Sequence, residues 1–181
     1  MSDTLITIIA IFLAATLMFI VPLMSVTERN DDIAQSVVDA ATAEFVDTVS
    51  NAGSIKPSDY EAFEQKLAST GNTYEIEIEI QVLDENPGKK PATTSGDLIG
   101  ENIRYSIFTS EIMDYMYPTT GQIDNMIRNY PLKKGDIIVV TVKNTNETMA
   151  EQFRSFIFKV TGKGTYEIAT TREAMILNNG K

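Results

Sequence analysis

The chain has no cysteine, no histidine and no tryptophan among its 181 residues. Without cysteine it can form no disulfide and offers no thiolate nucleophile. Without histidine it lacks the commonest general base and a principal zinc ligand, so a Ser-His-Asp triad is excluded. We therefore expect a protein that is not an enzyme and that holds no metal and no cofactor.

Basic residues are few. Lys and Arg number 15 against 25 acidic residues, for a formal net charge of −10. Such a chain repels the phosphates of nucleic acid. The segment Asp84–Gly88 lacks the spacing of a calcium loop, and Thr161–Thr165 lacks that of a phosphate-binding loop. We expect neither nucleic acid nor a small-molecule substrate as a partner.

Charge is missing altogether between Asp3 and Glu28, and the run Leu5–Met24 reads LITIIAIFLAATLMFIVPLM. About 20 helical residues span the roughly 30 Å hydrocarbon layer of a bilayer. A cleaved signal peptide would have a basic leader and a shorter apolar stretch, and a buried core helix would carry a polar stripe. We favour a retained transmembrane segment, residues 1–26, in contact with membrane lipid. The residues expected to form this membrane and assembly helix are Leu5, Ile8, Ile9, Phe12, Leu13, Leu17, Phe19, Ile20 and Pro22, the last as a kink.

Residues 27–52 extend the same helix in amphipathic form. The apolar residues recur with helical spacing at Ile33, Ala34, Val37, Val38, Ala41, Phe45 and Val49. The opposite face is expected to carry Gln35, Asp39, Asp47 and Ser50, and Gly53 suits a position just past the helix end. We predict one helix from near Leu5 to near Asn51, roughly 70 Å long. Asp31 and Asp32 are interpreted as a charged collar outside the membrane.

Residues 53–181 predict a globular α+β head with a small antiparallel sheet and packed helices. The clearest strand is Tyr74–Val82, where apolar residues alternate with glutamates. Further strands are expected at Asp136–Lys143 and Tyr166–Ile176, and a weaker alternation occurs at Ile103–Ile107. The segment Asp84–Gly100 is expected to be an exposed loop.

Helices of the head are predicted from caps and periodicity. A capping box at Ser58–Glu61 opens one helix, which buries Tyr60, Phe63 and Leu67. Thr109 or Ser110 caps a second, and Ile123–Tyr130 suggests a short third. Asn146 is expected to cap a fourth helix, whose inward residues are Met149, Phe153, Phe156, Ile157 and Val160, before a turn at Gly162 and Gly164.

This layout resembles the type IV pilin-like and Tad-type (TadE-like) minor pilins or pseudopilins. The resembling stretch runs from Leu5 to about Gly53: an apolar helix with a late proline and an amphipathic extension. The resemblance implies a helix that is first held in the membrane and then packs against other copies, with the C-terminal domain outside. It also implies that Asp3, in place of the family's glutamate, pairs with a neighbouring N-terminal amine.

Two functions are therefore expected from the sequence. The first is a structural subunit of a bacterial pilus-like filament or secretion assembly, a homo- or hetero-oligomer with other pilin-like subunits. The second is a monomeric, single-pass membrane-anchored binding or accessory module of the cell envelope. Both place the chain in the cell membrane, and the first also in an extracellular filament.

Overall fold

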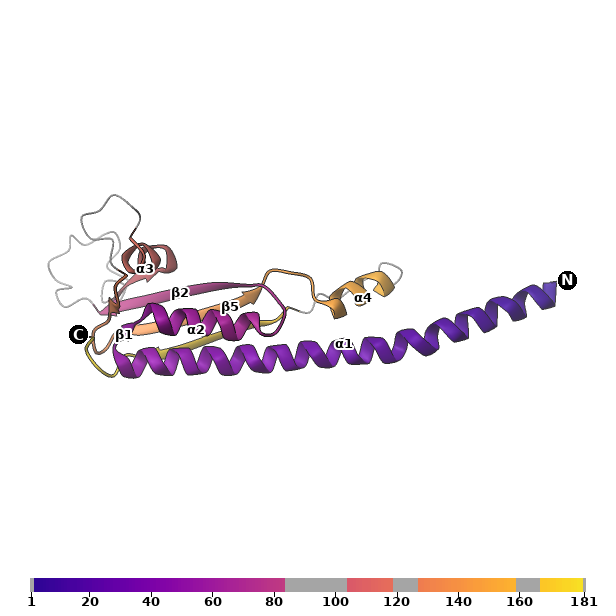
Figure 1. Ribbon diagram of the computed structural model, residues 1–181, viewed down its shortest axis with the longest axis horizontal. Coiled ribbons are helices and arrows are strands. Elements are labelled where there is room, and N and C mark those ends of the chain that lie inside the picture. The colour runs from indigo at the N-terminus through magenta and orange to yellow at the C-terminus, as the bar shows by residue number, and fades with distance from the viewer. Residues whose placement is uncertain (1, 84–103, 119–126, 159–166, 181) are drawn as a thin grey trace, which may run out of the picture.

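The computed structural model describes residues 2–83, 104–118, 127–158 and 167–180. A single long helix, α1 (Ser2–Ala52), runs for 51 residues and carries a small α+β domain on its C-terminal half (Figure 1). The predicted continuous helix is confirmed. It continues through Pro22, and its N-terminal half curves gently.

The main sheet is antiparallel and has the strand order β3-β2-β5-β6. Its strands are β2 (Tyr74–Leu83), β3 (Arg104–Phe108), β5 (Ile137–Asn144) and β6 (Ala169–Met175). Two short strands, β1 (Ser54–Ile55) and β4 (Tyr130–Pro131), pair with each other. The helices of the head are α2 (Pro57–Ala68), α3 (Thr109–Met116) and α4 (Met149–Phe158). The four predicted strands of the main sheet are thus confirmed, with ends shifted by up to a few residues.

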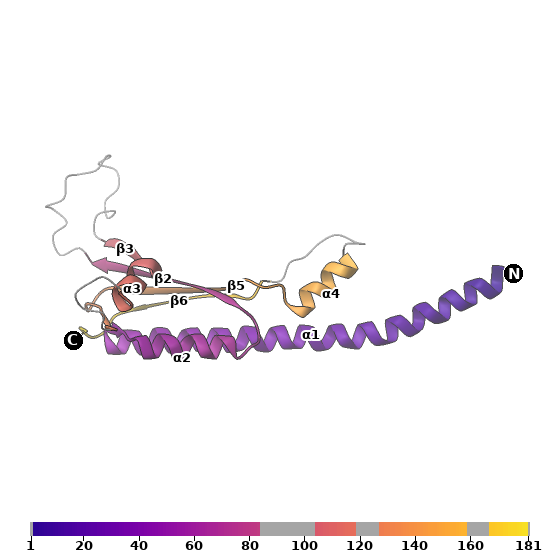
Figure 2. The ribbon, with the colours of Figure 1, turned by 45° about the horizontal axis from the view of Figure 1, so that its top comes forward.

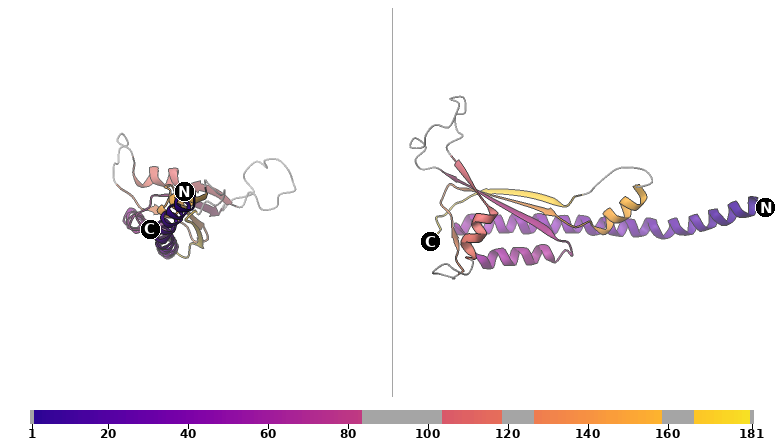
Figure 3. Two further views of the ribbon diagram at one scale, coloured as in Figure 1. Left: turned by 90° about the vertical axis from the view of Figure 1, so that its right-hand side faces the viewer. Right: turned by 90° about the horizontal axis from the view of Figure 1, so that it is seen from above.

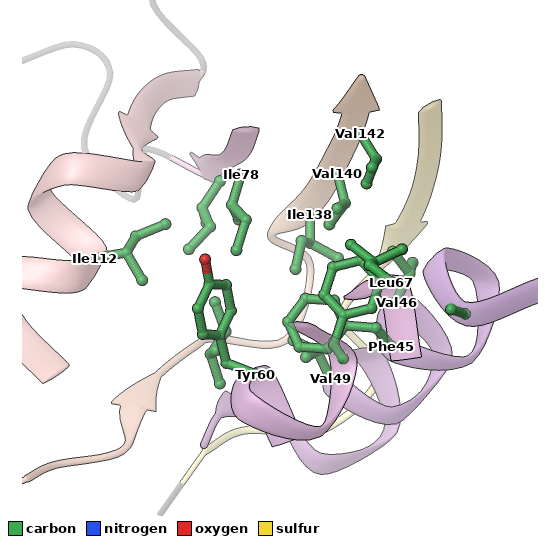
Figure 4. Packing of buried hydrophobic residues seen from close by; sticks show 14 of the residues in the cluster. Phe45, Val46, Val49, Tyr60, Leu67, Ile78, Ile112, Ile138, Val140 and Val142 are labelled. Atoms are coloured by element: carbon green, nitrogen blue, oxygen red, sulfur yellow. The ribbon is translucent and has the colours of Figure 1, made fainter. Parts of the chain in front are cut away.

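The C-terminal half of α1 and the whole of α2 lie side by side on one face of the sheet (Figures 2 and 3). The hydrophobic core fills the space between these two layers (Figure 4). Phe45 of α1 stacks on Phe63 of α2 with ring centroids 4.6 Å apart. Ile78, Ile138 and Val140 meet them from the sheet and are fully buried. Among the described residues, the core begins at Ala34, so the apolar half of α1 contributes nothing to it.

The buried face of α1 differs in part from the predicted one. Ile33 is 57% exposed although it was expected to face inward. It lies about 100° around the helix from Ala34, which is buried, and this angle carries it past the edge of the sheet. Conversely, Ser50 is buried and Gln35 half-buried, because their side chains donate hydrogen bonds to Met175 O (2.6 Å) and Ala169 O (3.1 Å) of β6.

The capping box predicted at Ser58 is wrong. The helix α2 starts with Pro57 in its first turn after Lys56, and its N-cap makes no side-chain hydrogen bond. Proline suits this first position because its missing N–H would be unpaired there anyway. The predicted buried face of α2 is confirmed.

A capping box does form before α4, from Thr148 and Glu151 instead of Asn146. The Glu151 amide donates to the Thr148 hydroxyl (3.2 Å), and the Thr148 amide donates to the Glu151 carboxylate (3.1 Å). Asn146 instead accepts from the Thr73 amide at 2.8 Å and so ties two turns together. Met149, expected to face inward, is 65% exposed.

Three other expectations concern the middle of the chain. Thr109 does not cap α3; its hydroxyl accepts a hydrogen bond from the Ile78 amide of β2 at 2.7 Å. The helix expected at Ile123–Tyr130 is contradicted where residues are described, because 127–129 are irregular and Tyr130 pairs with Ile55. The loop Asp84–Gly100, the glycine turn after α4 and the inward side chains expected within and just after α4 lie outside the described residues.

Candidate functional site

The candidate site is the apolar half of α1, which extends away from the head (Figure 1). Its predicted residues are exposed in the single chain, from 50% at Leu17 to 78% at Phe19, while Ile20 is half-buried and Pro22 exposed. The intervening large residues Ile6, Ile11 and Met18 are exposed as well. Side chains on every side of the helix are therefore uncovered, and none of its most apolar 18-residue window is buried. This helix is long and apolar enough to cross a membrane.

The few hydroxyl groups of this half find partners within the helix itself. The hydroxyls of Thr7, Thr16 and Ser25 donate to backbone carbonyls four residues earlier, at 2.8, 2.8 and 3.3 Å. Such bonds satisfy a polar side chain without water. Asp3 stands alone as the exposed ionisable side chain near the start of the described helix. Apart from Asp3, the half-helix is uncharged up to Glu28, and the hydroxyl groups of Thr7, Thr16 and Ser25 are hydrogen-bonded without water.

A buried polar junction joins α1 to α4 just beyond this half. Asp31 is only 6% exposed, and its carboxylate accepts a hydrogen bond from the Thr148 hydroxyl at 2.7 Å. Ala150 and Thr27 are buried beside it. The expected collar is therefore only half correct, since Asp32 is exposed but Asp31 holds the first turn of α4 against α1.

The contact between Asp31 and Thr148 was not predicted from the sequence, although the sequence does indicate where α4 begins. Thr148 and Glu151 have the spacing of a capping box, which locates the start of a helix. No local pattern links Thr148 to Asp31, which lies 117 residues earlier. Views from the side and from above show α4 beside α1 where its two halves meet, with the C-terminal end of α4 toward the N-terminus of α1 (Figures 1 and 3).

The pKa values of three tyrosines in the head are raised above the ordinary value. Burial, and then the neighbouring Glu64 carboxylate, raise the pKa of Tyr60. Burial and Glu61 raise the pKa of Tyr117, and burial raises the pKa of Tyr130. All three phenols stay protonated at neutral pH, and those of Tyr60 and Tyr117 donate hydrogen bonds to Glu64 and Glu61.

The described part of the chain does not bring three acidic side chains together as a metal site would require. A groove of about 200 Å³ between α1 and α2 is lined by Phe45, Phe63 and Lys66, among other residues. Most of the exposed large hydrophobic residues in the described part of the chain lie in the apolar half of α1. What the molecule defines, then, is an α+β head on a long helix whose other half is bare and apolar.

Comparison with known proteins finds no matching family model, no matching curated protein and no matching solved structure.

Proposed function

We propose that this protein is a structural subunit of a bacterial pilus-like filament or secretion assembly. Its apolar half-helix holds it in the cell membrane and then packs against the same helix of sister or related subunits, with the head on the outer side. The observation that carries the proposal is the division of α1: exposed apolar residues in one half, and the spine of the head in the other.

Energetics support a helix that is always covered. Fully burying one large aliphatic or aromatic side chain is worth about 1.5–3 kcal/mol. The exposed residues of the half-helix include Leu5, Ile8, Ile9, Phe12, Leu13, Leu17 and Phe19. Leaving these seven side chains in water instead of fully burying them would cost about 10–21 kcal/mol, which is comparable to the whole stability of a small domain, about 5–15 kcal/mol. Lipid or neighbouring helices are the two environments that remove this cost.

Rigid attachment of the head supports the assembly role. Because α1 is one uninterrupted helix, the position of its apolar half fixes the position of the head. The side chains of Gln35 and Ser50 donate hydrogen bonds to the two ends of β6 and so hold the sheet against α1. In such a subunit, regular packing of the half-helices would also arrange the heads regularly.

Disulfide crosslinking in native membranes tests the proposal, because the chain has no cysteine of its own. Single substitutions Ile8→Cys, Phe12→Cys and Met18→Cys should yield dimers on oxidation, and a chain that carries two of these cysteines should yield longer ladders. Glu77→Cys, exposed on the head, is the matched control and should yield far less. Monomers alone at native expression, from every site, would instead support the monomeric anchored module.

A further inference from the structure

We propose that the C-terminal end of α4 lies in the lipid headgroup layer, as a second contact with the membrane beside α1. This inference rests on the proposed function, because it needs the apolar half of α1 to lie in the bilayer. The partner is the membrane surface itself, and the inference assigns it a specific part of the head.

The junction with α1 sets the height of α4. Asp31 follows Met24, the last residue of the apolar run, by seven residues, or about 10 Å along the helix. The Thr148 hydroxyl is bonded to Asp31 at 2.7 Å, so the first turn of α4 starts at that height. Its N-terminal turn is fixed there, because Ala150 is fully buried.

The direction of α4 then brings it to the membrane. From Thr148 the helix runs toward the N-terminus of α1 and leans away from it (Figures 1 and 3). Ser155 also lies seven residues on from Thr148, so it descends by at most about 10 Å. Because the helix leans (Figures 1 and 3), the descent is smaller than this and the end of α4 stays above the level of Met24. The headgroup layer is about 5–7 Å thick on each side of the hydrocarbon, so a descent of about 5 Å is enough to bring Ser155 into it.

The chemistry of α4 suits this layer. Its sequence, MAEQFRSFIF, contains one acidic and one basic residue in ten, in a chain of net charge −10. Met149 at its first turn is 65% exposed, although it is apolar. Amphipathic helices that carry Phe on their apolar face settle at the boundary between headgroups and acyl chains, and α4 contains three phenylalanines. Contact at α4 as well as α1 would fix the angle of the head above the membrane.

Depth measurements on the full-length protein test the inference. Single variants Ser155→Cys, Met149→Cys, Phe12→Cys and Glu77→Cys carry an environment-sensitive fluorophore in nanodiscs of phosphatidylcholine and phosphatidylglycerol. Nitroxide groups on the lipid headgroup or on the acyl chain serve as quenchers. Because interfacial helices lie roughly 5–10 Å into the boundary, headgroup quenching at Ser155 should be at least about twofold that at Glu77, with Met149 between them.

The two controls separate the possible failures. Phe12 quenched by the acyl-chain nitroxide, with Ser155 no more quenched than Glu77, would overturn the α4 contact and leave the anchor intact. If Phe12 escapes the acyl-chain nitroxide as well, both the anchor and the α4 contact are overturned.

Discussion

At the residue scale, Gly53 holds the C-terminal tail against the end of α1. Its φ of +68° is in the left-handed region, and an added Cβ would stand 2.2 Å from Asn178 O and 2.7 Å from Gly180 N. Its carbonyl also accepts a hydrogen bond from Leu132 N at 2.8 Å. The obstructing atoms belong to the backbone, so they cannot move aside as a flexible side chain would.

Gly53→Ala should therefore lower the free energy of unfolding by about 2–4 kcal/mol, from strain and from the lost tail contacts. Gly71 is the matched control, since its φ is +80° but no atom lies within 4 Å of an added Cβ. Gly71→Ala should cost only the left-handed strain of about 1–2 kcal/mol. Denaturant unfolding of the full-length protein in detergent measures both; a smaller loss for Gly53→Ala would show that the tail does not pack there.

Tyr60 gives the head a sensitivity to alkaline pH. Burial and the Glu64 carboxylate raise its pKa above the ordinary tyrosine value of 10.0. The folded state therefore keeps this proton at a pH where the unfolded chain has lost it, so the stability is complete below pH 10 and falls above it. Tyr60→Phe retains the edge-on ring contact with Phe45, whose centroid is 6.3 Å away.

The free energy of unfolding, measured across roughly pH 9 to 11, should fall less steeply for Tyr60→Phe than for the unmodified protein. Tyr117 and Tyr130, whose pKa values are also raised, account for the alkaline loss that remains. An identical slope in the two proteins would mean that Tyr60 is hydrated in the folded head.

At the scale of the element, the two faces of α1 should respond differently to the same truncation. Phe45 is 4% exposed and stacks on Phe63, whereas Ile33, twelve residues earlier on the same helix, is 57% exposed. Phe45→Ala should cost about 3–5 kcal/mol through lost burial and a cavity. Ile33→Ala should stay within about 0.5 kcal/mol, measured by the same unfolding method. A large loss at Ile33 would restore the face expected from the sequence.

The sequence predicts elements well where the signal is local and repeated. The unbroken run of helix-compatible residues from Leu5 to Asn51 and the alternation at Tyr74–Val82 each extend over many positions. Caps are less secure because a short pattern occurs by chance. Both Ser58–Glu61 and Thr148–Glu151 match the capping box, but Pro57 starts its helix early, and only the second box forms.

Long-range contacts were beyond sequence reasoning. The apolar spacing that ends at Tyr130 looks helical when only neighbouring residues are considered. In the structure Tyr130 pairs with Ile55, which lies 75 residues earlier and which no local pattern indicates. In the sequence Asp31 resembles a surface charge, but in the fold it is buried and accepts a hydrogen bond from the Thr148 hydroxyl. For the candidate site, the run of apolar residues predicts an uncovered helix, but its junction with α4 depends on the fold of the whole head.

At the scale of the whole molecule, the protein consists of two parts that share one helix but no core. The hydrophobic core of the described residues starts at Ala34, and the first buried polar groups of α1 are Thr27 and Asp31. Among the described residues of the apolar half-helix ahead of them, none is buried in the single chain. Its removal should therefore leave the packing of the head unchanged.

A variant lacking residues 1–25 should keep a free energy of unfolding within about 0.5 kcal/mol of the full-length protein, because none of the described residues that it lacks is buried. It should also stay monomeric in buffer without detergent, since the large exposed apolar surface is gone. Calorimetry and analytical ultracentrifugation measure the two properties.

As a matched control, the same truncation with Asp31→Ala should be less stable by about 1–3 kcal/mol, because the Thr148 hydroxyl then loses its buried partner. If the truncated head unfolds at a much lower temperature, the half-helix must contact the head and cannot be free to pack against lipid or other subunits.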